Sequence, residues 1–212
     1  IIATKGGVVP TLRRKGLRGK IKRKNLIKEC EKSLKRLGVD TIDLYQIHWP
    51  LPPEDVEEAF LALLELQEVG KIRWPGVSNF SAEQLESISK HGKVASLQSP
   101  YSLLKRTVEK EEPTWCEKNS CGFLAYSPLQ SGILTNKFGR EWVSSISDND
   151  WRKSRLTFIQ DDQLDQTISY VSFLKSFAKE RGKNISQLAI AWLLSKKVVT
   201  SVIVGVRKKG QI

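Results

Sequence analysis

Short apolar runs alternate with amphipathic stretches along the whole chain. The apolar runs, rich in Ile, Val and Leu, predict β-strands at residues 1–4, 42–47, 72–77, 94–97, 122–126 and 201–204. Between them, apolar residues recur every three or four positions, which predicts helices that include residues 26–37, 56–64, 81–88, 164–178 and 185–192. Ser81 and Gln84 form a capping-box pattern, Gly182 is placed to end a helix, and Asn184 is placed to cap the next one.

Strict alternation of strands and helices favours a parallel sheet, either open and doubly wound or closed as a (β/α)8 barrel. The first strand is followed by Lys5-Gly6-Gly7, which is not the Gly-rich dinucleotide fingerprint of the open fold. Polar residues stand at the ends of several strands: Lys5, His48, Ser78, Asn79, Gln98 and Ser127. The mouth of a barrel draws on many strand ends in this way. We therefore predict an α/β fold, an incomplete (β/α)8 TIM barrel with about six of its eight parallel strands.

Residues 139–159 do not fit this alternation. They are polar and show no clear period, so we expect a long loop over the site or a mobile segment. The length of 212 residues suits one domain, and we assign residues 1–212 to a single domain.

The composition is that of an ordinary globular protein, with 40% hydrophobic and 27% charged residues. No uninterrupted apolar run of about 18 residues is present, so we expect no membrane partner. The N-terminus does not resemble a signal peptide and the chain has no methionine, so we expect that it is processed, trimmed or partial. Three cysteines without paired spacing argue against a disulfide framework and favour a reducing compartment. No Cys and His residues have metal-ligand spacing, so we expect no metal site.

The net charge is +12, and much of it lies within residues 13–36. Such a field attracts a polyphosphate cofactor or a nucleic acid, but it is also typical of a solvated loop and helix face, which we favour. No aromatic residue lies among these basic residues, which argues further against a nucleic-acid partner.

His48 stands in the most informative run of the sequence. Residues 42–50 read IDLYQIHWP, so the imidazole follows an apolar strand that Pro50 brings to an end. Barrels place catalytic groups at this end of a strand. The alternative is a core histidine whose nitrogens are satisfied by neighbouring backbone groups.

Several segments, in order, resemble the aldo-keto reductase family. They are IATK at 2–5, LKRLGVD at 34–40 leading into IDLYQIH at 42–48, GKIR at 70–73, GVSNF at 76–80, LQSPYSLL at 97–104, AYSPL at 125–129 and VGVR at 204–207. The resemblance runs the length of the chain, and it implies a carbonyl reductase that uses NADPH.

The resemblance also implies catalytic roles for Lys5 and His48. Hydride arriving at a carbonyl carbon leaves negative charge on the oxygen, and donors must be aimed at that charge. His48 would hydrogen-bond the oxygen and orient the substrate. Lys5 would pair with the aspartate of the family and lower the pKa of the tyrosine that gives the proton, since a nearby cation favours phenolate.

The remaining strand ends correspond to cofactor contacts of the family. They are Ser78, Asn79 and Gln98 at the nicotinamide carboxamide, Tyr126 on the nicotinamide ring, Ser127, Leu129, Ser131 and Lys137 at the pyrophosphate, and Gly205, Arg207 and Gln211 at the adenosine end. Arg207 can pair bidentately with a ribose 2′-phosphate, and Lys208 or Lys209 can add charge. The resemblance therefore favours NADP over NAD.

The sequence also departs from the family. The family's aspartate and tyrosine precede its third strand, at which this chain begins, and the family's C-terminal segment does not follow Ile212. The chain has four tyrosines, and none stands at the position of the family's proton-donating tyrosine: Tyr45, Tyr101, Tyr126 and Tyr170. We therefore expect the 212 residues alone to be inactive.

Two hypotheses on function follow. The first is NADPH-dependent reduction of small carbonyl substrates by the complete protein. The second is a dinucleotide-binding regulatory or interaction subunit without catalytic activity. We expect a cytoplasmic location, with a plastid left open because a transit peptide would lie upstream, and the oligomeric state stays open.

Overall fold

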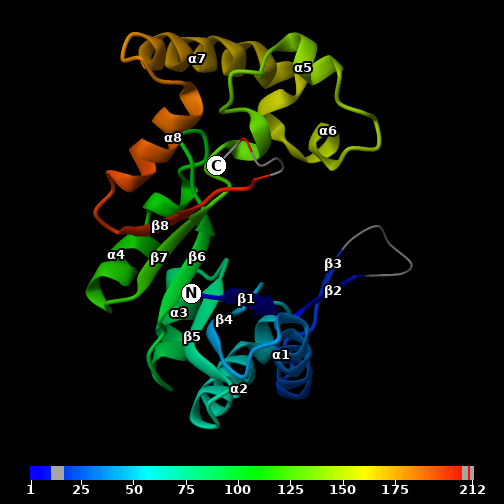
Figure 1. The fold of residues 1–212 in the computed structure, drawn as a ribbon, viewed down its shortest axis with the longest axis vertical. Coiled ribbons are helices and arrows are strands. Elements are labelled where there is room, and N and C mark those ends of the chain that lie inside the picture. Colours follow the sequence, from blue (N-terminus) through cyan, green and yellow to red (C-terminus); the bar gives the residue numbers. More distant parts are fainter. Residues whose placement is uncertain (11–16, 207–209, 211–212) are drawn as a thin grey trace. The chain divides into compact units, whose positions relative to one another are not determined.

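The computed structural model describes residues 1–10, 17–206 and 210. Within these residues, the main sheet has six strands in the order β1-β4-β5-β6-β7-β8 (Figure 1). β1 pairs in parallel with β4, β4 with β5, and β5 with β6. The predicted fold class is therefore confirmed: an α/β fold with a parallel sheet of six strands, consistent with an incomplete barrel.

Contacts divide the chain into two compact units, Ile1–Ser99 with Val108–Leu124, and Pro100–Thr107 with Ala125–Ile212. The first unit contains β1 (Ala3–Gly6), β2 (Val8–Pro10), β3 (Leu17–Gly19), α1 (Arg23–Leu37), β4 (Ile42–Ile47), α2 (Val56–Glu68), β5 (Ile72–Ser78), α3 (Ala82–Ser89) and α4 (Glu112–Lys118). The second contains α5 (Arg140–Ser144), α6 (Trp151–Arg155), α7 (Asp161–Lys179), α8 (Ile185–Leu194) and β8 (Val199–Ile203). β6 (Ser96–Pro100) and β7 (Gly122–Tyr126) begin in the first unit and end in the second.

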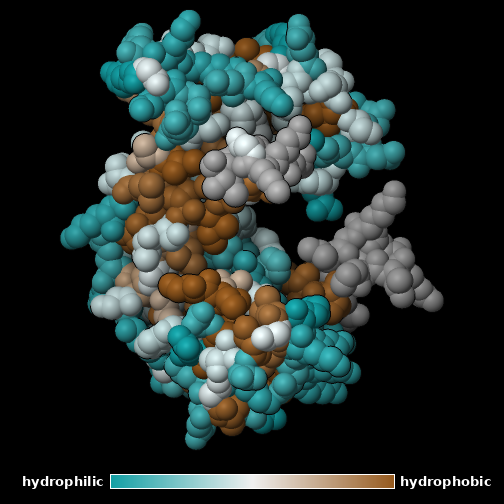
Figure 2. Space-filling model, in the orientation of Figure 1, coloured by the Kyte–Doolittle hydropathy of each residue, from teal (hydrophilic) through white to brown (hydrophobic). Residues whose placement is uncertain are grey.

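The helices form where the sequence pattern places them. α1 buries Leu26, Cys30 and Leu34 along one side, and Gly38 ends it in the left-handed conformation at φ 67°. Its opposite side, toward solvent, is hydrophilic (Figure 2). Capping boxes begin α3 at Ser81 and α8 at Asn184, which confirms both predicted caps.

The strands at 42–47 and 122–126 coincide with the prediction, and the other four strands are displaced by one to three residues at one or both ends. The sequence analysis missed α4 and the antiparallel pair of β2 and β3. β2 and β3 are three residues long, so neither gives an alternating pattern that differs from that of a loop.

The expectation of a long loop at residues 139–159 is wrong. The segment contains α5, α6 and a 3-10 turn, Thr157–Ile159. Ile146, Leu156 and Ile159 from this segment are buried in the core of the second unit, together with residues of α7 and α8. α5 and α6 have five residues each, so neither is long enough to repeat an apolar position over two helical turns.

The three cysteines are free and buried in this structure. Among the described helices, none has the length and apolar character needed to cross a membrane.

Candidate active site

A lower row of side chains crosses four strands of the first unit on one face of the sheet. Lys5 of β1 is paired in register with Gln46 of β4. Gln46 is paired with Gly76 of β5, and Gly76 with Ser96 of β6. Residues paired in this way in parallel strands point to the same face. Lys5, Gln46, Gly76 and Ser96 therefore form one row, which we call the lower row.

An upper row lies two residues further toward the carboxyl ends of the strands. Ser78 of β5 is paired with Gln98 of β6. His48 follows β4, and its N–H donates to the Gly6 carbonyl oxygen at 2.9 Å, so the ladder with β1 continues past the end of the strand. Alternation along β4 then points His48 to the same face as Gln46. We call His48, Ser78 and Gln98 the upper row.

His48 is half-buried, and its pKa is shifted downward. Burial is the main cause, and the positive charge of Lys5 is the second. Lys5 can act on His48 because both side chains point to the same face of the sheet, from β1 and from the residue that follows the adjacent strand β4. The imidazole is therefore neutral at pH 7 and offers one N–H donor.

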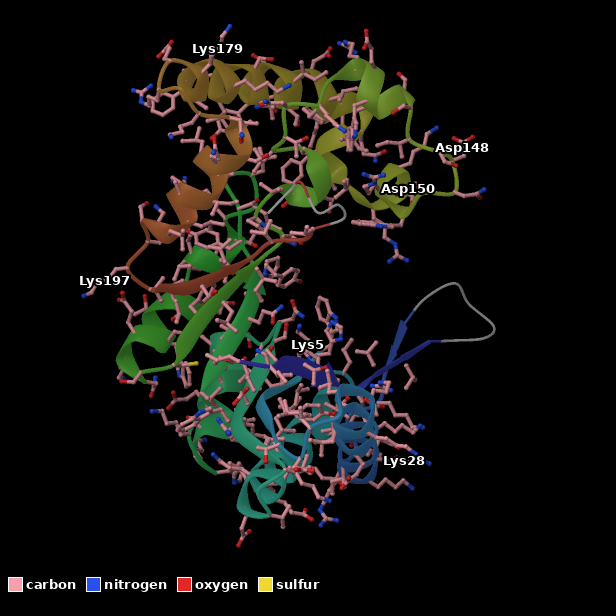
Figure 3. All side chains as sticks on the ribbon, in the orientation of Figure 1. Lys5, Lys28, Asp148, Asp150, Lys179 and Lys197 are labelled. Atoms are coloured by element: carbon pink, nitrogen blue, oxygen red, sulfur yellow. The ribbon has the colours of Figure 1, made fainter. Side chains whose placement is uncertain are left out.

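Lys5 is half-buried on β1 (Figure 3). Burial lowers the pKa of its ammonium group. In the described part of the chain, no acceptor lies within hydrogen-bond distance of this ammonium, and no carboxylate pairs with it.

Asn79 connects the three strand ends of the upper row. Its side-chain Nδ2 donates to the His48 carbonyl oxygen at 2.9 Å and to Ser78 Oγ at 3.1 Å. Its backbone N–H and the Ser78 hydroxyl both donate to the Gln98 carbonyl oxygen at 2.9 Å. Asn79 has φ 64°, a conformation that asparagine adopts more readily than most residues. The structure therefore brings together His48, Ser78, Asn79 and Gln98, as the sequence predicts.

The loop after β7 belongs to the second unit and has an unusual backbone. Ser127, Gln130 and Ser131 have positive φ values of 56°, 44° and 55°. Non-glycine residues in this region carry strain, which concentrates at binding sites. Tyr126, at the end of β7, is partly buried, and burial raises the pKa of its phenol.

A side-chain network holds this loop against residues 100–107. The Ser102 hydroxyl donates to Oε1 of the buried Gln130 at 3.1 Å, and the Lys105 N–H donates to Ser102 Oγ at 3.0 Å. The hydrogen bond to the Gln130 side chain therefore helps to stabilise the strained backbone conformation of this residue.

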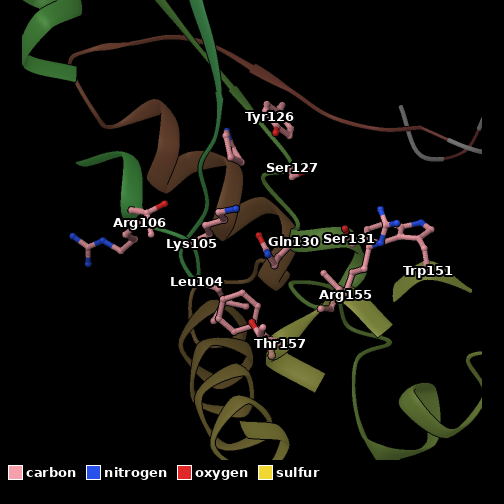
Figure 4. Close-up of a pocket in the computed structure, with 14 residues that line it drawn as sticks. Leu104, Lys105, Arg106, Tyr126, Ser127, Gln130, Ser131, Trp151, Arg155 and Thr157 are labelled. Atoms are coloured by element: carbon pink, nitrogen blue, oxygen red, sulfur yellow. The ribbon is translucent and has the colours of Figure 1, made fainter. Parts of the chain in front are cut away.

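A pocket of about 520 Å³ opens beside the loop, within the second unit (Figure 4). Its polar and aromatic lining includes Lys105, Arg106, Thr107, Tyr126, Ser127, Gln130, Ser131, Trp151 and Arg155. Cationic side chains next to hydroxyl groups suit an anionic ligand such as a phosphate. Trp151 and Arg155 were not predicted from the sequence, because both stand on α6 in the segment expected to be a loop. Lys105, Arg106, Thr107 and Gln130 were not predicted either.

Three other predicted cofactor residues that the structure describes in this unit are not among the residues that line the pocket. Leu129 packs against the core of the second unit, and Lys137 and Gly205 are exposed. Arg207 and Gln211 lie outside the described residues.

Tyr45 of the first unit and Tyr101 of the second unit each have a structural partner within their own unit. Tyr45 is fully buried on the opposite face of β4, where its hydroxyl donates to the Leu26 carbonyl oxygen at 3.4 Å. Burial raises the pKa of its phenol. Tyr101 is buried against Trp192, with ring centroids 5.3 Å apart.

The sequence profile of the aldo/keto reductase family matches residues 1–212. The chain belongs to this family. Similar curated proteins include the aldo-keto reductase YhdN of Bacillus subtilis, 37% identical over 90% of this chain and 57% of its own length. The NADH-specific methylglyoxal reductase of Escherichia coli is 30% identical over 87% of this chain and 56% of its own length. The chain therefore spans little more than half the length of the curated aldo/keto reductases it matches.

Solved aldo/keto reductase structures agree with the fold. The glycerol dehydrogenase AKR11B4 of Gluconobacter oxydans matches 99% of this chain and 64% of its own chain, with a TM-score of 0.89 and 34% identity. The holo form of the aldo-keto reductase AKR11C1 of Bacillus halodurans matches 100% of this chain and 64% of its own chain, with a TM-score of 0.77. The second is 22% identical, and its likeness supports the fold.

Aldo/keto reductases bind nicotinamide dinucleotides, and Ser78 and Gln98 of the upper row carry hydroxyl and amide groups that could pair with a carboxamide. The backbone carbonyl oxygen of Gln98 accepts hydrogen bonds from the Asn79 N–H and from the Ser78 hydroxyl. Among the described residues, no hydrogen bond engages the side-chain amide of Gln98. An amide of this kind can donate to and accept from a carboxamide.

Proposed function

We propose that the protein reduces aldehydes or ketones to alcohols with NADPH. The observation that supports this most strongly is that His48 directly follows β4 and points to the same face of the sheet as Lys5 on the adjacent strand β1. A protein that only bound a dinucleotide would need neither of these side chains at the carboxyl end of the sheet. Membership of the aldo/keto reductase family supports the same reaction class.

His48 is suited to hold the oxygen of a carbonyl substrate. Bound NADPH supplies the hydride that the carbonyl carbon accepts, and negative charge then develops on the oxygen. The neutral imidazole can donate a hydrogen bond from its N–H to that oxygen and stays uncharged while it does so. One donor aimed at a developing oxyanion contributes about 10² to 10³ in rate.

Lys5 supplies positive charge next to this donor. Its ammonium is half-buried, where a charge acts more strongly than it does in water. We propose that in the whole protein Lys5 lowers the pKa of a proton-donating tyrosine, as the resemblance to the family implies.

Ser78, Asn79 and Gln98 supply the groups that would orient the carboxamide of the cofactor. The hydrogen bonds among these three residues fix the Ser78 hydroxyl and the Asn79 amide before a ligand arrives, which reduces the entropy lost on binding, and they leave the Gln98 amide available to the ligand. A fixed carboxamide determines which face of the nicotinamide ring is turned toward the substrate.

The second unit supports a phosphate-binding role. Its pocket combines Ser127 and Ser131 with Lys105 and Arg155, groups that bind phosphate oxygens. One relative is named as NADH-specific, so family membership does not decide between NADPH and NADH. The choice of NADPH rests on Arg207, Lys208 and Lys209, whose charge suits a 2′-phosphate.

One observation favours a second candidate, a dinucleotide-binding subunit without turnover. Tyr45 and Tyr101 are both buried against structural partners, so neither is placed as the proton donor. For this reason we propose that the 212 residues alone do not turn over an aldehyde. Measurable reduction of 4-nitrobenzaldehyde by this chain alone would contradict that proposal.

The experiment that tests the function follows NADPH oxidation by the whole protein with 4-nitrobenzaldehyde. We expect turnover by the wild type and a loss of about 100-fold in Lys5→Met, as for removal of a group that assists proton transfer. Lys28→Met is the matched control, because Lys28 is exposed on α1, away from β1 (Figure 3). Tight NADPH binding by the wild type without any turnover would favour the binding subunit instead.

A further inference from the structure

Gln46 is a fully buried amide in the lower row, two residues before His48. Its Nε2 donates to the Val77 carbonyl oxygen at 3.3 Å and to Ser96 Oγ at 3.2 Å. One side chain of β4 therefore reaches across β5 to a side chain of β6. Neither catalysis nor cofactor binding, as described so far, uses this residue.

Gly76 makes room for this connection. A Cβ at position 76 would lie 2.5 Å from Ser96 Oγ and 3.1 Å from Gln46 Cγ. Any larger residue would occupy the space through which the amide of Gln46 meets the hydroxyl of Ser96. The lower row is therefore built around an amide that joins three strands directly beneath His48, Ser78 and Gln98.

The other end of this amide is unsatisfied. Gln46 Oε1 is buried and has no hydrogen-bond partner among the described residues. Exchanging the oxygen and nitrogen would let the oxygen accept from the Ser96 hydroxyl, but it would also set that oxygen against the Val77 carbonyl oxygen, which can only accept, and would leave the amide N–H groups without the Val77 acceptor. A buried acceptor without a donor costs free energy, so a donor is expected nearby.

Lys5 is the neighbour that can supply this donor. It is paired in register with Gln46, and its side chain points to the same face. Its half-buried ammonium also has no acceptor among the described residues. An unpaired acceptor and an unpaired donor thus lie on adjacent strands, and the four-carbon stem of lysine is flexible enough to join them.

We propose that Gln46 is a positioning residue whose Oε1 accepts a hydrogen bond from the Lys5 ammonium and holds it beside His48. That this matters for carbonyl reduction rests on the proposed function; the contact itself does not. Without this acceptor, the ammonium of Lys5 loses one of the groups that fix it beside His48; the aspartate that the resemblance to the family implies is the other.

A double-mutant cycle on the pKa of His48 tests the proposal in the chain itself. The chain has two histidines, so NMR titration can follow His48 directly. Lys5→Met should raise the pKa of His48, because it removes a nearby positive charge. In a Gln46→Met background, which keeps the volume but removes the acceptor, Lys5→Met should have a clearly smaller effect.

Ser96→Ala is the matched control. It removes the hydroxyl that Nε2 contacts but leaves Oε1 in place, so the full effect of Lys5→Met should remain. If Gln46→Met does not fold, Gln46→Asn serves in its place, because it keeps an amide but withdraws the oxygen by one methylene. If Lys5→Met raised the pKa of His48 by the same amount in the wild-type and Gln46-substituted backgrounds, the proposal would be overturned.

Turnover provides the functional arm in the whole protein. Gln46→Met should lower turnover by about 10- to 100-fold, the cost of a misplaced catalytic group, while NADPH affinity changes little. If the wild type shows no turnover, the proposed function fails, and the pKa cycle still decides whether Gln46 holds Lys5.

Discussion

The side-chain amide of Asn79 donates a hydrogen bond of 2.9 Å to the backbone carbonyl oxygen of His48. This bond joins the residue after β5 to the residue after β4, and the same Nδ2 also reaches Ser78 Oγ at 3.1 Å. Asn79 thus fixes the position of the proposed substrate-orienting histidine as well as one of the proposed carboxamide contacts.

Replacing Asn79 tests this double role. Asn79→Gly removes both side-chain hydrogen bonds but tolerates φ 64°, whereas Asn79→Ala removes them and adds backbone strain of about 1 kcal/mol. We expect weaker NADPH binding in both variants and a lower free energy of unfolding in Asn79→Ala than in Asn79→Gly. Fluorescence titration and urea unfolding measure the two quantities. Unchanged NADPH affinity in Asn79→Gly would argue against the cofactor role.

The lowered pKa of His48 predicts a loss of stability in mild acid. Because the folded pKa lies below the unfolded value of about 6.5, the unfolded chain takes up this proton first. The stability that the folded chain has while His48 is neutral is present above about pH 6.5. It is lost as the pH falls through the pKa that His48 has in the folded chain. Urea unfolding between pH 7.5 and pH 5 should show a steeper loss in the wild type than in His48→Gln. Equal losses would mean that His48 is not held neutral by its surroundings.

The cysteines are predicted to be unreactive in the folded chain. Burial, followed by the charge of Glu31, raises the pKa of Cys30 to about 11. A hydrogen bond with Cys121 and burial raise the pKa of Cys116. Since thiolate is the reactive form, a thiol reagent at pH 8 should label none of the three quickly, and all three after unfolding in guanidinium. Rapid labelling of Cys116 in the native chain would contradict the buried contact with Cys121.

The fold was predictable where one physical signal dominated. Residues 42–47 and 122–126 are apolar runs, and they form β4 and β7 without displacement. Residues 139–159 were mispredicted because Ile146, Leu156 and Ile159 are anchored by tertiary packing, which leaves no period in the local sequence. The assignment of the whole chain to one domain stays a prediction.

The candidate site was predictable at the ends of apolar sequence runs and not inside them. His48, Ser78 and Gln98 stand out because polar residues end apolar runs. Gln46 lies inside such a run, and its importance depends on Gly76 and Ser96, which only the register brings next to it. Arg155 was missed because its position in the pocket depends on α6, which the sequence pattern does not indicate.

The proposed preference for NADPH rests on Arg207, a residue outside the described part of the chain. Arg207, with Lys208 and Lys209, supplies charge that a 2′-phosphate would use. In the whole protein NADPH should bind at least about tenfold more tightly than NADH, roughly 1.4 kcal/mol, and Arg207→Ala should narrow the difference. Equal affinities in the wild type by fluorescence titration would contradict the preference for NADP.

The central claim, that His48 orients the carbonyl of a substrate, is tested most directly by His48→Ala in the whole protein. Turnover, NADPH affinity and melting temperature are measured on the same preparation, with His91→Ala as the control at the other histidine. The proposed role predicts a loss of about 10² to 10³ in turnover with NADPH affinity almost unchanged. A lower melting temperature with full activity per folded molecule would show instead that His48 is a structural residue of the core.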